Sequence, residues 1–156
     1  MLDNKNAAIW FVDRHVEEGR GSNVAFREAD GQRRSQTYAE LAERSDLLAG
    51  AFESAGLRRE ERVACLILDQ LEYPEIFWGA LKAGVVPVAL NTLLATSVYQ
   101  ATLNDSRAAC LIVSLELWET VEPALVENKD LRKVIVIGEK TPPKAISYVD
   151  LSLIHI

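Results

Sequence analysis

Cysteine and histidine are scarce in this sequence. Two of each occur in 156 residues, and no window has the Cys and His spacing that a zinc site requires. Cys65 and Cys110 each lie inside an apolar run rich in β-branched residues, which predicts buried, reduced thiols. The N-terminus shows no secretory signal, so we expect a cytoplasmic protein. A disulfide between the two cysteines is the less favoured alternative.

Long apolar runs and clusters of positive charge are also missing. No stretch approaches the roughly 20 apolar residues of a membrane-spanning helix, so we expect no membrane partner. The net charge is −6, and the pairs Arg33-Arg34 and Arg58-Arg59 are interpreted as solvated surface residues, so we expect no nucleic-acid partner. A hydrophobic fraction of 49% and a charged fraction of 26% are ordinary for one globular domain.

An amphipathic helix is expected near the N-terminus. Asn4 or Asn6 is the predicted N-cap, and the Gly19–Gly21 region is the predicted end of the helix. The residues that recur at helical spacing on its apolar face are Ala8, Phe11, Val12 and His15.

A β-hairpin and a capped helix follow. Val24 and Phe26 alternate with polar residues up to the turn dipeptide Asp30-Gly31, and residues 33–37 return as the second strand. Thr37 and Glu40 have the Thr-x-x-Glu spacing of a capping box and predict the start of a helix that Gly56 ends. The expected buried face of this helix is Leu41, Leu48, Ala51, Phe52 and Ala55.

From residue 62 onward, apolar strands alternate with helices. Strands are expected at 62–68, 85–90, 108–113 and 133–138, with a last short strand at 145–151, and helices at 74–83, 96–106 (capped by Thr96) and around 118–125. The apolar residues of the strand at 62–68 do not alternate with polar ones, which indicates a sheet covered on both faces. Pro87 removes one backbone donor and indicates an edge strand. The predicted fold class is therefore α/β, a mostly parallel sheet flanked by helices, with an N-terminal helix and β-hairpin.

Several segments occur in an order that is typical of one enzyme family. They are Val24-Ala25-Phe26, Thr37 to Leu41, Val63 to Asp69, Gly79 to Asn91 and Asp105 to Ala108. Together they resemble the N-terminal part of the large domain of adenylate-forming acyl-CoA synthetases. The opening residues, Asn6-Ala7-Ala8, Asp13-Arg14-His15 and Glu18-Gly19-Arg20-Gly21, are similar to the benzoate–CoA ligase branch.

The resemblance implies a two-step reaction in a longer parent enzyme. An aromatic carboxylate attacks the α-phosphate of ATP to give an acyl-adenylate and pyrophosphate, and the CoA thiolate then displaces AMP. In the family, a Gly/Ser/Thr-rich loop ending in Pro-Lys-Gly holds the phosphates with Mg²⁺, and a lysine on a small C-terminal domain serves adenylation. This sequence has no such loop, because Pro143-Lys144 is followed by Ala145.

We therefore expect an N-terminal fragment that is inactive alone. ATP, Mg²⁺ and CoA belong to the parent enzyme, and no cofactor is expected on the fragment. Residues 1–151 are expected to form a partial N-terminal domain of the AMP-binding type, and residues 152–156 a non-native or disordered tail. No catalytic, cofactor-binding or metal-binding residue of the family is carried over to this chain.

Three polar residues occupy positions where function is conceivable. Asp69 follows the strand at 62–68, at the carboxyl edge where open α/β sheets bind ligands, but we favour an acid that caps the next helix. His15 has no accompanying cluster of His, Cys or acids and is interpreted as a packed helix histidine. Lys82, on an otherwise apolar helix, is interpreted as a snorkelling side chain rather than a catalytic one.

The remaining candidates also favour a structural interpretation. Tyr73, Trp78 and Trp118 suit either an aromatic pocket or the core, and core packing is preferred. Asn91 ends the strand at 85–90 and is expected to make turn hydrogen bonds. The glycines at 79 and 84 have phosphate-loop spacing, but a helix interior and its end cannot cradle a phosphate.

Three hypotheses remain. The first is a fragment of a benzoate–CoA ligase-like enzyme, whose apolar helix at 74–83 and sheet faces are left exposed and drive homo-oligomer formation. The second is a free-standing, non-catalytic α/β module for ligand binding or interaction. The third is an intact small enzyme. Binding of ATP, benzoate or CoA separates the second from the first, and benzoate-dependent exchange of pyrophosphate into ATP identifies the third.

Overall fold

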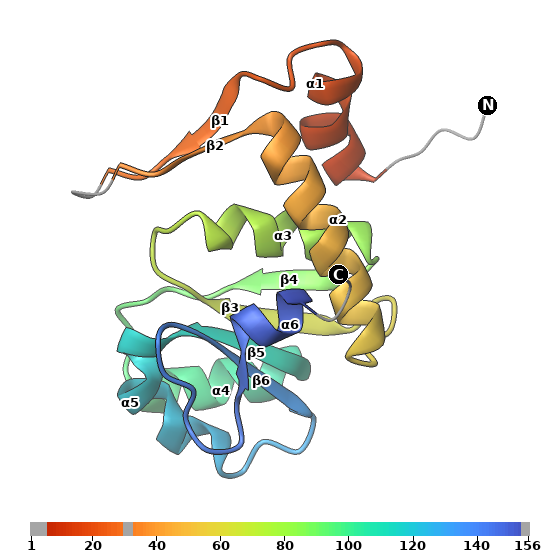
Figure 1. Ribbon diagram of the computed structural model, residues 1–156. Helices are drawn as coiled ribbons and strands as arrows, with labels where there is room; N and C mark the ends of the chain where they lie inside the picture. Colours follow the sequence, from red (N-terminus) through yellow and green to blue (C-terminus); the bar gives the residue numbers. More distant parts are fainter. Residues whose placement is uncertain (1–5, 30–32, 154–156) are drawn as a thin grey trace.

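The computed structural model describes residues 6–29 and 33–153 and confirms the α/β class. A five-stranded, fully parallel sheet has the strand order β4-β3-β5-β6-β7, and a separate antiparallel hairpin pairs β1 with β2. The hairpin and the N-terminal helix lie on one side of the sheet and extend away from it (Figure 1).

The helices and strands alternate along most of the chain. The strands are β1 (Val24–Arg27), β2 (Ser35–Thr37), β3 (Arg62–Leu66), β4 (Val86–Ala89), β5 (Ala108–Ser114), β6 (Lys133–Ile137) and β7 (Ile146–Ser147). The longer helices are α2 (Tyr38–Ser54), α3 (Glu72–Lys82), α4 (Thr96–Ser106) and α6 (Tyr148–Leu153). The short helices are η1 (Ile9–Asp13), α1 (Arg14–Glu17), η2 (Leu115–Leu117), α5 (Trp118–Val121) and η3 (Glu122–Leu125).

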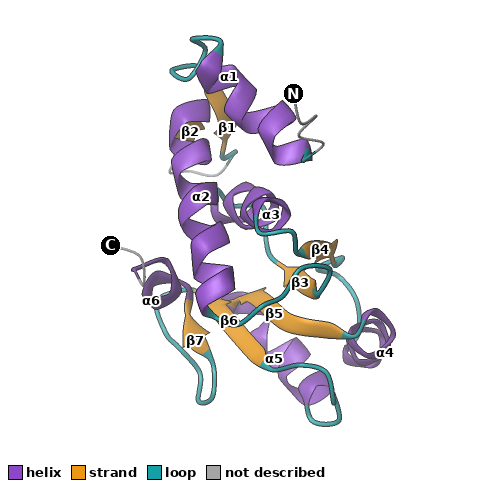
Figure 2. Cartoon of the chain, turned by 90° about the vertical axis from the view of Figure 1, so that its right-hand side faces the viewer, coloured by secondary structure: helices purple, strands orange, loops and turns teal. Residues whose placement is uncertain are grey.

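Both faces of the sheet are covered by helices. Along β3, Val63 and Cys65 face a cluster built with α2, α3 and α6, whereas Ala64 and Leu66 face a cluster built with α4 and α5. Figure 2 shows these two groups of helices on opposite sides of the sheet. All seven residues of β5 are buried. The prediction of a two-sided sheet is confirmed, and the expectation that its faces are exposed is wrong.

The edge position of β4 is also as predicted. β4 pairs only with β3 among the described strands, in parallel register from Arg62↔Val86 to Cys65↔Ala89. Pro87 lacks an amide donor, and an edge strand tolerates that loss on the side that faces away from its neighbour.

The capping box of α2 forms as the sequence predicts. The Thr37 hydroxyl accepts from the Glu40 amide at 3.3 Å, and the Glu40 carboxylate accepts from the Thr37 amide at 2.7 Å. Gly56 follows the helix with φ +79°, the left-handed conformation that favours glycine. These signals are local in sequence, and they mark where α2 starts and ends.

The N-terminal helix departs from its prediction in one respect. Asn6 caps it, since its side chain accepts from the Ala8 amide at 2.9 Å, and Ala8 and Val12 are fully buried. Phe11, expected on the same face, is instead 56% exposed. The π-helical turn η1 explains this, because the Arg14 amide donates to the Ile9 carbonyl and the wider turn rotates Phe11 outward. Asn4 lies outside the described residues.

Two further local predictions are wrong. Thr96 is the first residue of α4 rather than its N-cap, and its hydroxyl donates to the Thr120 carbonyl at 2.8 Å. The expected strand at 145–151 is a strand only at Ile146–Ser147. The Ser147 hydroxyl accepts from the Val149 amide at 3.2 Å and starts α6, which places Leu151 in the core.

Two predictions concern residues that lie outside the described part of the chain. The turn dipeptide Asp30-Gly31 lies outside the described residues. α6 continues to Leu153, and 154–156 also lie outside the described part, so the interpretation of 152–156 as a tail stays a prediction.

The close approach of α2 and α3 depends on Gly79. A Cβ atom at this position would lie 2.8 Å from the Leu48 Cβ and 3.1 Å from the Ser45 carbonyl oxygen. Contacts of that length force one helix away from the other. Gly79 therefore lets the two backbones touch, and the apolar residues of both helices fill the space above the sheet.

We predict that Gly79→Ala destabilises the protein. The new methyl group gains up to about 1 kcal/mol of helix propensity, but overpacking costs about 1–3 kcal/mol, so urea denaturation should show a net loss. Gly21→Ala is the matched control, because its nearest neighbour would lie at 3.4 Å, and its free energy of unfolding should change by less than about 0.5 kcal/mol. If Gly79→Ala and Gly21→Ala have the same free energy of unfolding, the close approach of α2 and α3 at Gly79 is contradicted.

Candidate functional site at the carboxyl edge of the sheet

Ser114 fixes the loop that follows β3 at the carboxyl edge of the sheet. Its fully buried hydroxyl accepts from the Leu68 amide at 3.0 Å and from the Gln70 side-chain amide at 3.3 Å. Asp69, between these two residues, is exposed. No side-chain hydrogen bond caps α3, so the prediction that Asp69 caps this helix is wrong.

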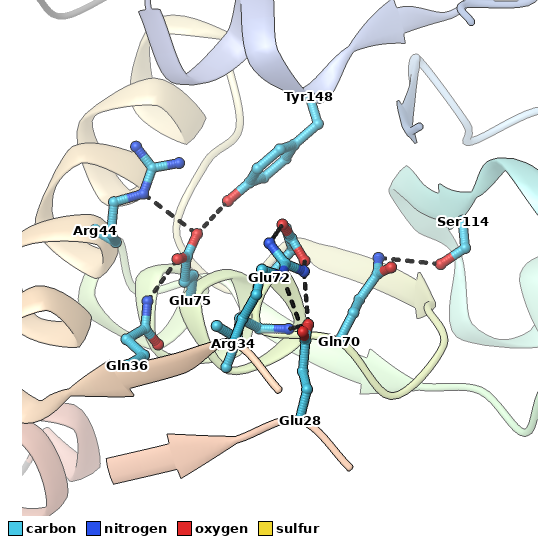
Figure 3. Close-up of polar contacts among 10 residues, drawn as sticks. Glu28, Arg34, Gln36, Arg44, Gln70, Glu72, Glu75, Ser114 and Tyr148 are labelled. Carbon is cyan, nitrogen blue, oxygen red and sulfur yellow. Dashed lines mark hydrogen bonds and ion pairs between the residues drawn. The ribbon is translucent and has the colours of Figure 1, made fainter. Parts of the chain in front are cut away.

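A buried carboxylate next to this loop holds the hairpin against α3. Arg34 donates to both oxygens of Glu28, at 2.6 and 2.9 Å, and to Glu72 at 3.0 Å (Figure 3). Glu28 also accepts from the Leu71 amide at 3.1 Å. The hydrogen bonds from Arg34 lower the pKa of Glu28, and those to Glu28 and Glu72 raise the pKa of Arg34. Glu28 and Arg34 are therefore charged at neutral pH, and Arg34 joins Glu28 to Glu72.

Arg34 is exposed, as predicted for a surface residue, and it also forms ion pairs with Glu28 and Glu72. The sequence contains one signal for the pairing that it makes. Glu28 precedes and Arg34 follows the predicted turn by similar distances, so a hairpin brings them opposite each other.

A second buried carboxylate, Glu75, joins four elements of the fold. It accepts from Gln36 at 2.6 Å, from the Tyr148 hydroxyl at 2.6 Å and from Arg44 at 3.4 Å (Figure 3). These partners lie on β2, α6 and α2. Burial is the main reason that the pKa of Tyr148 is raised, and the adjacent Glu75 carboxylate adds to it, so the phenol remains a donor at neutral pH. The Gln36 side-chain oxygen has no partner within 6–29 and 33–153.

Lys82 has a different environment from the one predicted. Its side chain is only 8% exposed, and its ammonium group donates to Asp13 and Asp46 at 2.7 Å each and to the Ala42 carbonyl at 3.3 Å. The snorkelling interpretation is therefore wrong, since the charge is neutralised inside the protein. A cleft of about 730 Å³ borders this cluster, and Arg59 also lines it.

A smaller cavity lies between the hairpin and the start of α3. It has a volume of about 270 Å³, and Phe26, Asp69, Tyr73 and Pro74 contribute to its walls. The polar atoms of Glu28 at this cavity are already bound to Arg34 and to the Leu71 amide. The cavity therefore offers one exposed carboxylate, Asp69, one exposed guanidinium, Arg27, and mostly apolar surface.

His15 and Asn91 behave as predicted. The His15 ring stacks on Tyr38 with centroids 4.0 Å apart, and its Nδ1 accepts from Arg20 at 3.1 Å. Asn91 accepts from the Leu93 amide at 2.8 Å through its side chain, which is the expected turn hydrogen bond.

The three aromatic candidates do not share one pocket. Tyr73 stacks on Phe77 and lines the hairpin cavity, and Trp78 packs edge-on against Phe77. Trp118 packs against the cluster on the opposite face of the sheet. None of the three is fully buried, so core packing accounts for only part of their surface.

The described residues hold no group of three His, Cys, Asp or Glu side chains suited to a metal ion. Burial raises the pKa of the Cys65 thiol to about 12 and also raises that of Cys110, and both cysteines are free and buried, as predicted. Within 6–29 and 33–153, no helix is long and apolar enough to cross a membrane.

Comparison with known proteins gives matches over nearly the whole chain. The family model described as "AMP-binding enzyme" matches residues 12–151. A 4-hydroxybenzoate/benzoate–CoA ligase of Rhodopseudomonas palustris is 39% identical over 91% of this chain, and a benzoate–CoA ligase of Thauera aromatica is 38% identical over 85%. These matches cover 26% and 25% of the two relatives, so the chain spans about a quarter of their length.

Solved structures agree with the sequence matches. The anthranilate CoA ligase AuaEII, solved in complex with anthranoyl-AMP, superposes with a TM-score of 0.86 at 29% identity, over 93% of this chain and 27% of that one. A benzoate CoA ligase from Burkholderia xenovorans LB400 superposes with a TM-score of 0.79 at 35% identity, over 94% of this chain and 28% of that one.

We predict that Tyr148→Phe lowers the free energy of unfolding by about 1.5–3 kcal/mol, the range for a hydrogen bond to a charged group. The reason is that Glu75 loses a donor while it stays buried. Urea denaturation of Tyr148→Phe, Glu75→Gln and the double variant measures the coupling between the two side chains. If Tyr148→Phe lowers the free energy of unfolding by the same amount in the Glu75→Gln background as in the unmodified chain, the hydrogen bond between the two side chains does not contribute to stability.

Proposed function

Because this chain belongs to the AMP-binding enzyme family, we propose that it is the N-terminal part of an ATP-dependent aryl-CoA ligase. The observation that carries the proposal is its 39% identity, over 91% of its length, to a 4-hydroxybenzoate/benzoate–CoA ligase. We propose that residues 1–151 form the N-terminal portion of the large domain, and that benzoate or a close aromatic acid is the substrate of the complete enzyme.

The proposed reaction has two steps. The carboxylate oxygen of the aromatic acid attacks the α-phosphorus of ATP, and pyrophosphate leaves as the mixed anhydride with AMP forms. The CoA thiolate then attacks the acyl carbonyl carbon, and AMP leaves with the electron pair of the broken C–O bond. The products are the aroyl thioester, AMP and pyrophosphate.

We assign no step of this reaction to residues of the chain. Four charged residues near the carboxyl edge already bind one another or neighbouring polar groups. They are Glu28, Arg34, Glu72 and Glu75. The described residues do not supply a set of ligands that fits Mg²⁺. We therefore propose that the chain contributes the walls of the large domain and is inactive alone.

The alternative is a non-catalytic α/β module that binds a small molecule. The cavity between the hairpin and α3 favours it, because it lies at the carboxyl edge of a parallel sheet, where open α/β folds bind ligands. Its walls are mostly apolar and include one exposed acid, Asp69, and one exposed base, Arg27.

The proposal predicts that this chain can replace the matching segment of a complete ligase. A chimera carries residues 12–151 in place of the matched segment of the R. palustris enzyme. Its benzoate-dependent exchange of pyrophosphate into ATP should stay within about tenfold of the parent, because well-packed cores tolerate hydrophobic changes of similar volume. A folded chimera without exchange would refute the proposed function.

The isolated chain is the matched control for this experiment. It should give no exchange above background, and calorimetry with ATP, benzoate and CoA should detect no binding. Binding without exchange would support the non-catalytic module, and exchange by the chain alone would identify an intact small enzyme.

We also infer that the isolated chain is a homo-oligomer and is cytoplasmic. Large apolar side chains are exposed at several sites, among them Trp10 (57%) and Phe11 (56%), and exposed apolar surface favours association. Two free, buried thiols suit a reducing compartment.

We predict a dimer or larger assembly of the isolated chain at micromolar concentration. Light scattering during size-exclusion chromatography measures its mass against the 17.3 kDa of one chain. A single monomeric peak across a tenfold dilution would contradict the inference.

A further inference from the structure

The cleft beside Lys82 is built from separate parts of the chain. Its volume is about 730 Å³, within the range of about 300–1,000 Å³ that is usual for small-molecule sites. The N-terminal helix contributes Ile9 and Asp13, and α2 contributes Asp46 and Ala49. Figure 2 shows the N-terminal helix, α2 and α3 together on one side of the sheet. The cleft is therefore a hollow between packed helices rather than a gap in a loop.

Lys82 holds the two acids of the cleft in place. Its ammonium group donates to Oδ1 of Asp13, to Oδ1 of Asp46 and to the Ala42 carbonyl. An ammonium group has three donors, so Lys82 has none left for a ligand. Among the residues that the structure describes, no hydrogen bond reaches the Oδ2 atom of either acid. Each acid therefore keeps one carboxylate oxygen that a ligand can use.

Arg59 is the second base of the cleft, and its environment differs from that of Lys82. Its side chain is exposed, and no other described residue forms a hydrogen bond or an ion pair with its guanidinium group. The stem of Arg59 lies over Gly84, where a Cβ atom would be 3.2 Å from the Arg59 Cγ and 3.4 Å from its Nε. Gly84 also has φ +74°, which favours glycine. The absence of a side chain at this position leaves room for Arg59 at the cleft.

The acids and Arg59 occupy different parts of the cleft. Both acids meet at Lys82, whereas Arg59 lies over Gly84, two residues further along the chain. Two residues span at most about 7 Å. The two acids and two bases cancel in net charge, so an anion drawn to Arg59 is repelled by the acids, and a cation is repelled by the bases. A ligand that carries both charges, a short distance apart, meets a partner at each end.

We propose that this cleft binds a small zwitterion, an amino acid whose ammonium and carboxylate groups are separated by a short carbon chain. The ammonium group donates to the Oδ2 atoms of Asp13 and Asp46, and the carboxylate accepts from Arg59, whose planar fork matches a carboxylate. Ile9 and Ala49 contact the carbon chain. The π-helical turn that carries Ile9 and Asp13 supports the assignment, because such turns are frequent at functional sites.

The proposed site is separate from the carboxyl edge of the sheet. Arg59 and Gly84 precede β3 and β4, so the cleft lies toward the amino ends of these strands. Glu28 and Glu72 lie instead near the loop that follows β3. The inference therefore does not depend on the proposed ligase function.

The test is ligand-observed NMR on the full chain with 4-aminobutanoate as the probe, because its extended length falls within the span given above. Saturation transfer should give a dissociation constant on the order of 1 mM, as expected for a ligand of about seven non-hydrogen atoms. Butylamine and butanoate each keep one of the two charges and should bind at least about tenfold more weakly, since each lacks one set of charge-assisted hydrogen bonds. Equal binding of all three, or no binding of 4-aminobutanoate, would overturn the proposal.

Arg59→Gln and Asp46→Asn should each raise the dissociation constant of 4-aminobutanoate at least about tenfold, because each removes one charge with little change of shape. Arg58→Gln and Glu43→Gln are the matched controls. They remove the same charges from the neighbouring residue and from the same helix, and neither position lines the cleft. All four positions are exposed, and thermal melts verify that the variants fold. The control variants should bind the probe as the unmodified chain does.

The variants also distinguish a zwitterion site from simpler ones. Binding that is lost in Arg59→Gln but kept in Asp46→Asn would indicate an anion site, the reverse would indicate a cation site, and either result overturns the proposal. Equal weakening by Arg58→Gln and Arg59→Gln would indicate an effect of net charge and would also overturn it. None of these measurements involves exchange of pyrophosphate into ATP, so their failure leaves the proposed ligase function untouched.

Discussion

The contact between α2 and α3 is the constraint on which the other interactions depend. Gly79 allows the two backbones to touch, and charged groups on α3 bind α2 on either side of that point. Glu75 meets Arg44 one turn before Gly79, and Lys82 meets Asp46 about one turn after it. The Glu75 and Lys82 side chains are buried, so separation of the helices would remove a polar partner from each of them. The helix pair therefore behaves as one rigid layer above the sheet.

This layer also places the N-terminal elements. Asp13 of the first helix shares Lys82 with Asp46, and Glu72 at the start of α3 shares Arg34 with Glu28. Helix and hairpin thus attach to opposite ends of α3. The polar residues near the carboxyl edge hold the hairpin against α3. The site therefore has many charged groups, but most of their polar atoms are already bound to one another.

Several local signals in the sequence predicted the structure correctly, although the expected caps at Thr96 and Asp69 did not form, and long-range partners were not predicted. The Thr37 capping box, the edge position of Pro87 and the two-sided burial of β3 depend on neighbouring residues or on composition, and the structure confirms them. Lys82 and Glu75 find partners between 31 and 73 residues away. A charged residue on an apolar helix is predicted to face solvent unless a distant partner is known. The prediction for Lys82 from the sequence alone was therefore wrong. The outward rotation of Phe11 was missed for another reason, since a π-helical turn has no sequence signature of its own.

Tyr148 and Leu151 have a consequence for biosynthesis. Both belong to the cluster that also contains Leu48 and Val63, although about a hundred residues separate them. During translation, α2, α3 and the central strands leave the ribosome first, with one edge of the core still open. This part of the core closes only after α6 has emerged, so the earlier segments expose apolar surface until then.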